Sequence, residues 1–283
     1  MRNFTVIMAV LLAFTSLNSC MEGKRQSSVI SRTGSNVSSR VVSQKRDRGQ
    51  NYNRVLLEIP ILYGEQPEQI ISHLGYTVSY NHKTCIANWV AYELTYDEVL
   101  GTVPSAKKFT PDPTINSKQA NNDDYKYSGW DRGHMCPAAD MKWSKQAMTE
   151  SFYYTNVCPQ NPNLNGGDWK ALEEKCRTLT QDYGNIYITC GAIIGNSIYG
   201  TLGNNSVVIP DAFYKVLLVN TPNGYESIGF YFENKAGHRN LNYYARTVDE
   251  IENLTNIDFF HSLPDTIEAA IESKYNLDVW RIN

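Results

Sequence analysis

Residues 128–140 read SGWDRGHMCPAAD, and this stretch carries the densest group of polar side chains in the sequence. An acid, a guanidinium and an imidazole lie within the four residues from Asp131 to His134. Histidine can accept a proton near neutral pH, arginine can bind a phosphate through two hydrogen bonds, and glycine allows close approach of the backbone. The stretch is therefore compatible with a site for phosphodiester chemistry. A surface turn closed by a salt bridge is the alternative interpretation.

A second group of polar residues follows at residues 155–177. Glu173 and Arg177 are four residues apart, so they share one face of the helix that the apolar spacing of residues 168–179 predicts. If this helix extends back to Asn165, then Asn165 and Glu173 lie about 80° apart around its axis and can line one side of a cleft. In the alternative interpretation, Asn165 caps the helix and Glu173 and Arg177 form a solvent-exposed ion pair.

The remaining elements follow no regular strand–helix–strand repeat, which indicates an α+β fold with an antiparallel sheet. The turn sequence Thr-Pro-Asn-Gly at 221–224 predicts a hairpin of strands 214–219 and 225–232. Further strands are predicted within 75–95, at 151–157 and at 185–194, and helices at 168–179, 247–254 and 264–274.

The two polar groups together resemble the DNA/RNA non-specific endonuclease family of the ββα-metal superfamily, in its endonuclease G-like form. Three motifs in order carry the resemblance: Asp-Arg-Gly-His at 131–134, Thr-Asn-x-x-Pro-Gln at 155–160 and Leu-Asn-x-x-x-Trp-x-x-Leu-Glu at 164–173. The resemblance extends over residues 52–280. It implies a central antiparallel β-sheet flanked by helices, with a ββα-metal catalytic motif.

The resemblance also implies a reaction centre with one hydrated metal ion. His134 would be the general base that takes a proton from the attacking water. Asn165 would be the one direct protein ligand of Mg²⁺, and Glu173 would hold waters bound to that ion. Mg²⁺ retains several waters and needs few protein ligands, so one asparagine can suffice. Mn²⁺ is the alternative ion, because it also favours oxygen ligands.

Further roles follow from the same resemblance. Arg132 would contact the phosphate, with Arg177 as a helper, and Asn156 would bridge the two strands of the site. Members of the family carry an arginine in the loop before the first motif, where this chain offers Lys107 or Lys108, which lack the bidentate fork of arginine.

Two cysteines, Cys136 and Cys158, flank the expected site on strands that the family pairs. A disulfide between them and a pair of buried thiols are the two alternatives.

The N-terminus has the features of a lipoprotein signal peptide at residues 1–19. Arg2 precedes an apolar run that is too short to span a bilayer, and residues 17–20, Leu-Asn-Ser-Cys, resemble a bacterial lipoprotein cleavage box. This resemblance implies cleavage before Cys20, acylation of Cys20 and attachment to a membrane. We therefore expect an exported protein of the cell envelope, either periplasmic or on the surface. Cleavage to a soluble secreted protein is the alternative.

Charge is distributed unevenly between the two predicted parts of the mature chain. Residues 20–54 are predicted to be a flexible, basic, serine-rich tether, in which residues 21–54 hold eight Lys or Arg and two acids. A basic arm that binds nucleic acid or anionic lipid is the alternative interpretation. The expected endonuclease domain, residues 55–283, has a net charge of −10. Binding of a polyanion must therefore rest on a local site or a metal.

These features together predict a metal-dependent endonuclease that hydrolyses DNA and RNA with little sequence specificity. A phosphodiesterase for another phosphate ester and a catalytically inactive, polymer-binding surface lipoprotein are the alternatives. The intact His134, Asn165 and Glu173 favour an enzyme. Some members of the family are dimers, so the resemblance also allows a homodimer.

Overall fold

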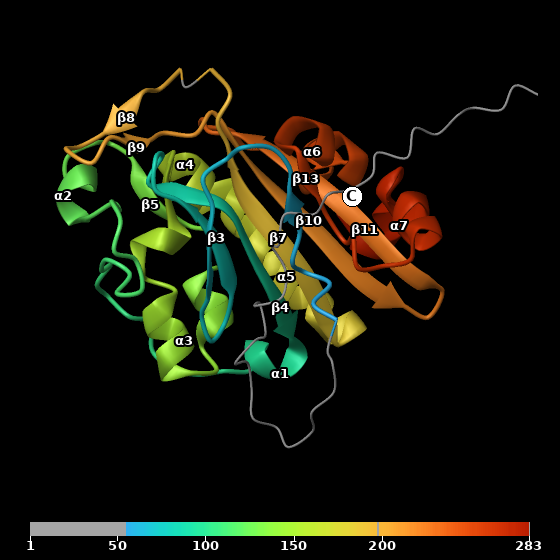
Figure 1. Cartoon of the computed structure of the whole chain (residues 1–283). Helices are drawn as coiled ribbons and strands as arrows, with labels where there is room; N and C mark the ends of the chain where they lie inside the picture. The colour runs from blue at the N-terminus through green and yellow to red at the C-terminus, as the bar shows by residue number, and fades with distance from the viewer. Residues whose placement is uncertain (1–54, 197, 283) are drawn as a thin grey trace, which may run out of the picture. The chain divides into compact units, whose positions relative to one another are not determined.

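The computed structural model describes residues 55–196 and 198–282. The predicted signal peptide, Cys20 and the tether lie outside these residues. Within the described part, seven antiparallel strands form a central sheet in the order β12-β11-β10-β7-β4-β3-β2, and helices pack against it (Figure 1). The fold is therefore of the α+β class that the sequence predicts.

The strands fall into the central sheet and three two-stranded pairs. The central sheet contains β2 (Gln69–Ser72), β3 (Thr77–Asn81), β4 (Ile86–Thr95), β7 (Asn185–Ile193), β10 (Ala212–Thr221), β11 (Gly224–Glu233) and β12 (Ala245–Arg246). The pairs are β1 (Ile61–Leu62) with β13 (Ile257–Asp258), β5 (Asp131–His134) with β6 (Val157–Gln160), and β8 (Thr201–Leu202) with β9 (Val207–Val208).

Most of the helices are short. The α-helices are α1 (Tyr96–Val99), α2 (Asn122–Tyr125), α3 (Lys145–Glu150), α4 (Pro162–Leu164), α5 (Lys170–Tyr183), α6 (Val248–Thr255), α7 (Asp265–Glu272) and α8 (Leu277–Trp280). The 3₁₀ turns are η1 (Ala138–Met141), η2 (Tyr154–Asn156) and η4 (Leu241–Tyr243), and η3 (Asn165–Trp169) is a π-helical turn. Of the helices in the described part, none combines the length and the apolar character needed to cross a membrane.

The hairpin of β10 and β11 confirms the prediction from its turn sequence. Thr221 pairs with Gly224 at the end of the ladder, and the φ angle of Gly224 is +112°, in the region that favours glycine. Because the turn is local, the sequence alone was enough to predict it.

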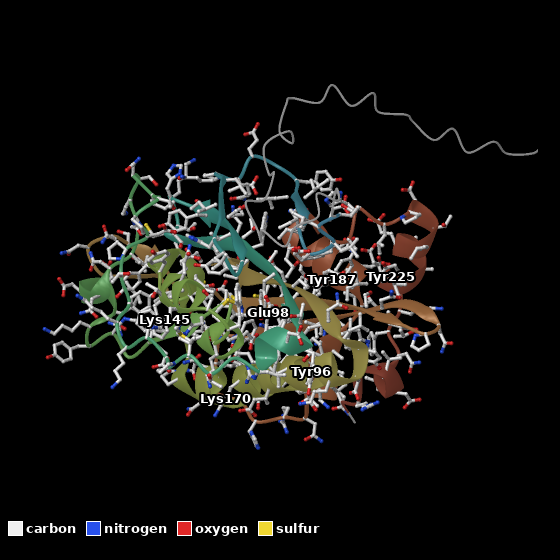
Figure 2. The ribbon with its side chains drawn as sticks, turned by 90° about the horizontal axis from the view of Figure 1, so that it is seen from below. Tyr96, Glu98, Lys145, Lys170, Tyr187 and Tyr225 are labelled. Carbon is white, nitrogen blue, oxygen red and sulfur yellow. The ribbon has the colours of Figure 1, made fainter. Side chains whose placement is uncertain are left out.

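The alternation of side chains along β10 creates two apolar cores, one on each face of the sheet. Leu217 belongs to the core that α5 covers, and Val216 belongs to the core that α6 covers. Figure 2 shows the two sides, with Lys170 on α5 below the strands and Tyr225 on the side of α7. The candidate site lies on the α5 face, because its motifs contribute to the first core.

The predicted strand at residues 151–157 is wrong except at its last residue, Val157, which begins β6. The preceding residues form a turn and η2. The side chain of Asn156 stabilises this bend, because its Nδ2 donates to the carbonyl oxygens of Ser151 and Cys136, each at 2.8 Å. The aromatic and β-branched composition of the segment reflects its burial, as at Tyr154 and Thr155, and does not reflect extended backbone.

Of the two alternatives for Cys136 and Cys158, the structure has the buried thiols. Cys158 stands opposite Gly133 in the ladder of β5 and β6, whereas Cys136 lies beyond the end of β5. The two residues are therefore not paired across the strands. Burial raises the pKa of the Cys158 thiol.

Candidate active site

Strands β5 and β6 form the base of the site. Asp131 pairs with Gln160, and Gly133 pairs with Cys158. A Cβ atom on Gly133 would collide with the side chain of Gln160, so only glycine fits at this position. This packing explains the glycine of the first motif and holds the neighbouring His134 on the opposite side of the strand.

The imidazole of His134 is enclosed by aromatic rings. Its ring centroid lies 5.1 Å from that of Phe109 and 4.9 Å from that of Phe152. Its Nε2 atom is buried, and within the described residues it has no hydrogen-bond partner. Burial lowers the pKa of His134 to about 4, so the ring is neutral at physiological pH. A neutral imidazole with an unused nitrogen can accept a proton.

Arg132 lies on the same face of β5 as His134, and its guanidinium is held in place from several directions. Its Nη2 donates to Oδ1 of Asn122 at 2.7 Å, and its Nε donates to the hydroxyl of Tyr154 at 3.3 Å. Its central carbon lies 5.7 Å from the centroid of the Phe109 ring, which also contacts His134. The structure therefore brings the guanidinium and the imidazole into contact with the same phenyl ring.

Asn165 is tied to the opposite face of β5. Its Nδ2 donates to Oδ2 of Asp131 at 2.9 Å, which leaves its side-chain oxygen for another ligand. The indole nitrogen of Trp169 donates to the carbonyl oxygen of His134 at 3.3 Å. These two hydrogen bonds attach η3 to both ends of β5.

The helix does not extend unbroken from α5 back to Asn165. Gly167 has φ −110° and ψ −109°, which breaks the helix between Asn165 and Glu173. The angle of about 80° expected for a continuous helix therefore does not apply. Asn165 is also not the N-cap of this segment, since that position belongs to Asn161, whose side chain accepts from the backbone N–H of Asn163 at 3.0 Å. Asn165 is instead the C-cap residue of α4.

Glu173 and Arg177 lie one turn apart on α5, but the structure places Arg177 in a different ion pair. Nη1 of Arg177 donates to Oδ1 of the fully buried Asp140 at 2.7 Å. Burial, together with the charge of Asp140, raises the pKa of Glu173 to about 8, although the charges of Lys215 and Arg177 oppose this shift. Arg177 therefore compensates a buried carboxylate and is not the solvent-exposed partner of Glu173.

Lys215 is a buried cation of the site that the sequence analysis missed. It lies on β10 with no exposed surface, and its Nζ stands 4.4 Å from the centroid of the Trp169 ring. Its charge acts on Glu173 and Asp140. The indication in the sequence was a single lysine within the apolar run AFYKVLLV at 212–219.

The remaining predicted residues lie at the margin of the site. Oδ1 of Asn156 accepts the backbone N–H of Cys136 at 2.8 Å, so this buried amide joins η2 to the chain after β5. Lys107 and Lys108 are exposed and directly precede Phe109, which contacts His134.

The family model of the DNA/RNA non-specific endonucleases matches residues 61–266. The chain belongs to this family. Among its relatives, mitochondrial nuclease EXOG of Danio rerio is 37% identical over 157 residues, which cover 52% of this chain and 46% of the relative. Mitochondrial endonuclease G of Homo sapiens is 35% identical over 167 residues, which cover 55% of this chain and 56% of the relative.

A bacterial relative and a solved structure extend the comparison. The nuclease of Nostoc sp. is 31% identical over 211 residues, which cover 70% of this chain and 76% of the relative. The structure of EndoG in its complex with EndoGI has a TM-score of 0.66 and 25% identity, and it covers 71% of this chain and 89% of that chain. The chain spans about half the length of the mitochondrial relatives.

The side chains of this endonuclease family member fit a hydrated divalent cation. Asn165 offers a neutral amide oxygen, because its nitrogen is already bound to Asp131. Glu173 offers a half-buried carboxylate on the next helix. Oxygen donors of these two kinds suit Mg²⁺, which binds through few protein ligands and keeps its waters.

Proposed function

We propose that the chain is a metal-dependent endonuclease that hydrolyses phosphodiester bonds in DNA and RNA with little sequence specificity. The observation that carries this proposal is the imidazole of His134, which is neutral, enclosed by Phe109 and Phe152, and has a buried nitrogen without a partner. A group in this state can act as a general base. Membership of the nuclease family supplies the class of substrate.

In the proposed reaction His134 takes a proton from the water that attacks phosphorus. The new bond joins the water oxygen to phosphorus, and the bond to the 3′-oxygen breaks. The released 3′-oxygen takes a proton from a second water molecule, which leaves 5′-phosphate and 3′-hydroxyl ends. The guanidinium of Arg132 binds the phosphate. It needs no reorganisation to do so, because Asn122 and Tyr154 already hold it.

Asn165 and Glu173 would hold the cation, Asn165 directly and Glu173 through bound water. When bound, Mg²⁺ or Mn²⁺ would stabilise the negative charge that develops on the phosphate and the leaving oxygen. Arg177 would support this arrangement, because it lies on the same helix as Glu173 and its pair with Asp140 ties this helix to η1.

Contacts to phosphate and sugar carry no sequence information, so a site built on Arg132 and a metal would accept both DNA and RNA. The exposed Lys107 and Lys108 would add charge at the edge of the site. These local charges would offset the net charge of −10 on the domain.

We also propose that the protein is exported and anchored in the cell envelope through an acylated Cys20, from which the tether of residues 20–54 would extend. A soluble secreted form is the alternative, and fractionation of cells would reveal it. A homodimer would be revealed by size-exclusion chromatography of the purified protein. Mass measurement of Cys20-containing peptides tests the anchor, because an unacylated Cys20 or an intact leader would contradict it.

The decisive experiment is digestion of plasmid DNA and of RNA by the purified chain, with Mg²⁺ and with a chelator. We expect cleavage of both substrates only with the metal. His134→Ala should lower the rate by about 10²-fold or more, the contribution expected of a general base.

His82→Ala is the matched control, because His82 is exposed in the turn between β3 and β4. It should retain the parent rate. Equal rates for the two histidine variants would contradict the assignment of the base. No cleavage by the parent would favour the two alternatives, a different phosphate ester or a polymer-binding protein.

A further inference from the structure

Helices α6 and α7 lie next to each other on the face of the sheet opposite α5, and carboxylates gather between them (Figure 1). Asp249 and Glu252 of α6 and Glu272 of α7 each offer one carboxylate oxygen, and these three atoms all lie within 4.8 Å of one another. Like charges at such separations repel each other, so this arrangement needs a compensating positive charge.

Glu272 provides a second and independent observation. Its side chain is buried, with 5% of its surface exposed, and its Oε1 has no hydrogen-bond partner among the described residues. A buried carboxylate oxygen without a partner is costly, because it has lost the water that would solvate it. This oxygen belongs to the residue that α7 contributes to the cluster, so the cost falls on one of the three side chains that a cation would bind.

The surroundings of Glu272 supply further negative charge. The groups whose charges act most on it are carboxylates: Glu252, Glu268, Asp249 and Asp258. A cation at this place would balance these negative charges.

The frame around the cluster is already fixed. Oε1 of Glu252 accepts the backbone N–H of Phe259 at 2.9 Å, which holds that side chain and leaves its second oxygen. The hydroxyl of Ser227 on β11 donates to the carbonyl oxygen of Ile271 at 2.8 Å, which holds α7 beside Glu272. Asp249 is accessible to solvent and gives an ion a route into the cluster.

We propose that Asp249, Glu252 and Glu272 form a site for one calcium ion, which joins α6 to α7. Calcium binds oxygen ligands at about 2.4 Å, so ligands on opposite sides of the ion are about 4.8 Å apart and one ion can touch all three oxygens. Mg²⁺ is smaller and demands a stricter octahedron, so it fits this spread of oxygens less well. The site is separate from the proposed catalytic metal, which would lie on the other face of the sheet.

The test is thermal unfolding of the full chain in chelator and in CaCl₂, together with calorimetric titration of Ca²⁺. We expect Ca²⁺ at about a hundred times its dissociation constant to raise the midpoint by about 5 °C or more, with one ion bound per chain. Glu272→Gln should lose this rise and the bound ion. In chelator the same variant should unfold at a higher temperature than the parent, because burial of Glu272 among carboxylates, either charged or after it binds a proton, costs free energy that glutamine avoids.

Two controls separate this site from others. Glu174→Gln removes a half-exposed carboxylate of α5 and should keep the calcium effect. Asn165→Ala should also keep it, because Asn165 belongs to the other face.

The proposal is overturned if Glu272→Gln keeps the rise, if Asn165→Ala loses it, or if Ca²⁺ does not change the midpoint of the parent. If Glu272→Gln does not fold, Glu252→Gln repeats the test. A Ca²⁺-dependent rise of the unfolding midpoint in Glu252→Gln would also contradict the proposal.

Discussion

Buried carboxylates lie on both faces of the central sheet, but their neighbours differ in charge. On the α5 face, Asp140 pairs with Arg177, and Lys215 lies close enough to lower the pKa values of Asp140 and Glu173. On the α6 and α7 face, the strongest charges around Glu272 are other carboxylates. One face carries its positive charge in the protein chain, whereas the other must obtain it from protons or from a bound ion.

This difference separates two ways of keeping acids inside a fold. A lysine or arginine provides a fixed charge that is present under all conditions. A cluster compensated by an ion or by protons has a stability that depends on the solution. On the α5 face the fixed charges leave Glu173 available to the reaction, and on the other face the cluster would join two helices. The comparison leads to three further expectations.

The largest effect is expected for removal of the buried cation. Lys215→Met should lower the free energy of unfolding by about 3 kcal/mol, because it leaves buried carboxylates without their charge partner. Urea unfolding measures this change. Lys170→Met, at a half-exposed lysine that pairs with Glu174 at 3.6 Å, should change it by less than about 0.5 kcal/mol.

A double variant makes the comparison sharper. Lys215→Met combined with Glu173→Gln should recover part of the lost stability, because without Lys215 the side chain of Glu173 is buried either as an unpaired charge or after it binds a proton, and glutamine avoids both costs. A fully additive loss in the double variant would show that Lys215 contributes by packing on Trp169 and not through its charge.

The second effect concerns two arginine–aspartate pairs of nearly equal length and different burial. Arg177→Met breaks a 2.7 Å pair with a fully buried Asp140 and should cost about 2 kcal/mol. Arg281→Met breaks a 2.8 Å pair with Asp182, in which the arginine is 60% exposed, and should cost less than about 1 kcal/mol. Urea unfolding of both variants measures the difference. Equal losses would mean that burial of the acid does not determine the value of the pair.

How far the sequence predicted this site depends on whether each feature is local. The turn at 221–224 is contiguous, so the hairpin followed from the sequence. The first motif is also contiguous and placed Arg132 close to His134, but the sequence analysis did not predict that this motif forms strand β5. The prediction of a strand at 151–157 was wrong, because aromatic and β-branched residues occur in a buried turn as well as in a strand. Only the contacts of Asn156 with Cys136, twenty residues earlier, distinguish the two.

The charges on the two faces were beyond the sequence for a different reason. Lys215 was visible as a lone lysine in an apolar run, but its neighbours lie on α5 and η1, which no local pattern connects to β10. The cluster of Glu252 and Glu272 arises from the packing of two helices that the sequence predicted separately. Helix positions were predictable from periodicity, whereas the contacts between helices required the packed structure.

The smallest expected effect is the pH dependence of stability in chelator, in which His134 on one face and Glu272 on the other contribute with opposite signs. The folded pKa of His134 is about 4, below its ordinary value near 6.5, so between these values the unfolded chain binds more protons and stability rises with pH. The folded pKa of Glu272 is about 9, above its ordinary value near 4.5, so between these values the folded chain binds more protons and stability falls as pH rises.

Each group contributes a slope of at most about 1.4 kcal/mol per pH unit. Between pH 7 and 9 the His134 contribution is constant, and we expect the parent to lose stability in chelator as the pH rises. Urea unfolding across this range should show a flatter profile for Glu272→Gln, whereas His134→Ala should keep the slope of the parent. Between pH 4.5 and 6.5 both groups contribute, so His134→Ala should remove the contribution that rises with pH and Glu272→Gln the contribution that falls. Identical profiles for the two variants would contradict the opposite signs expected for His134 and Glu272.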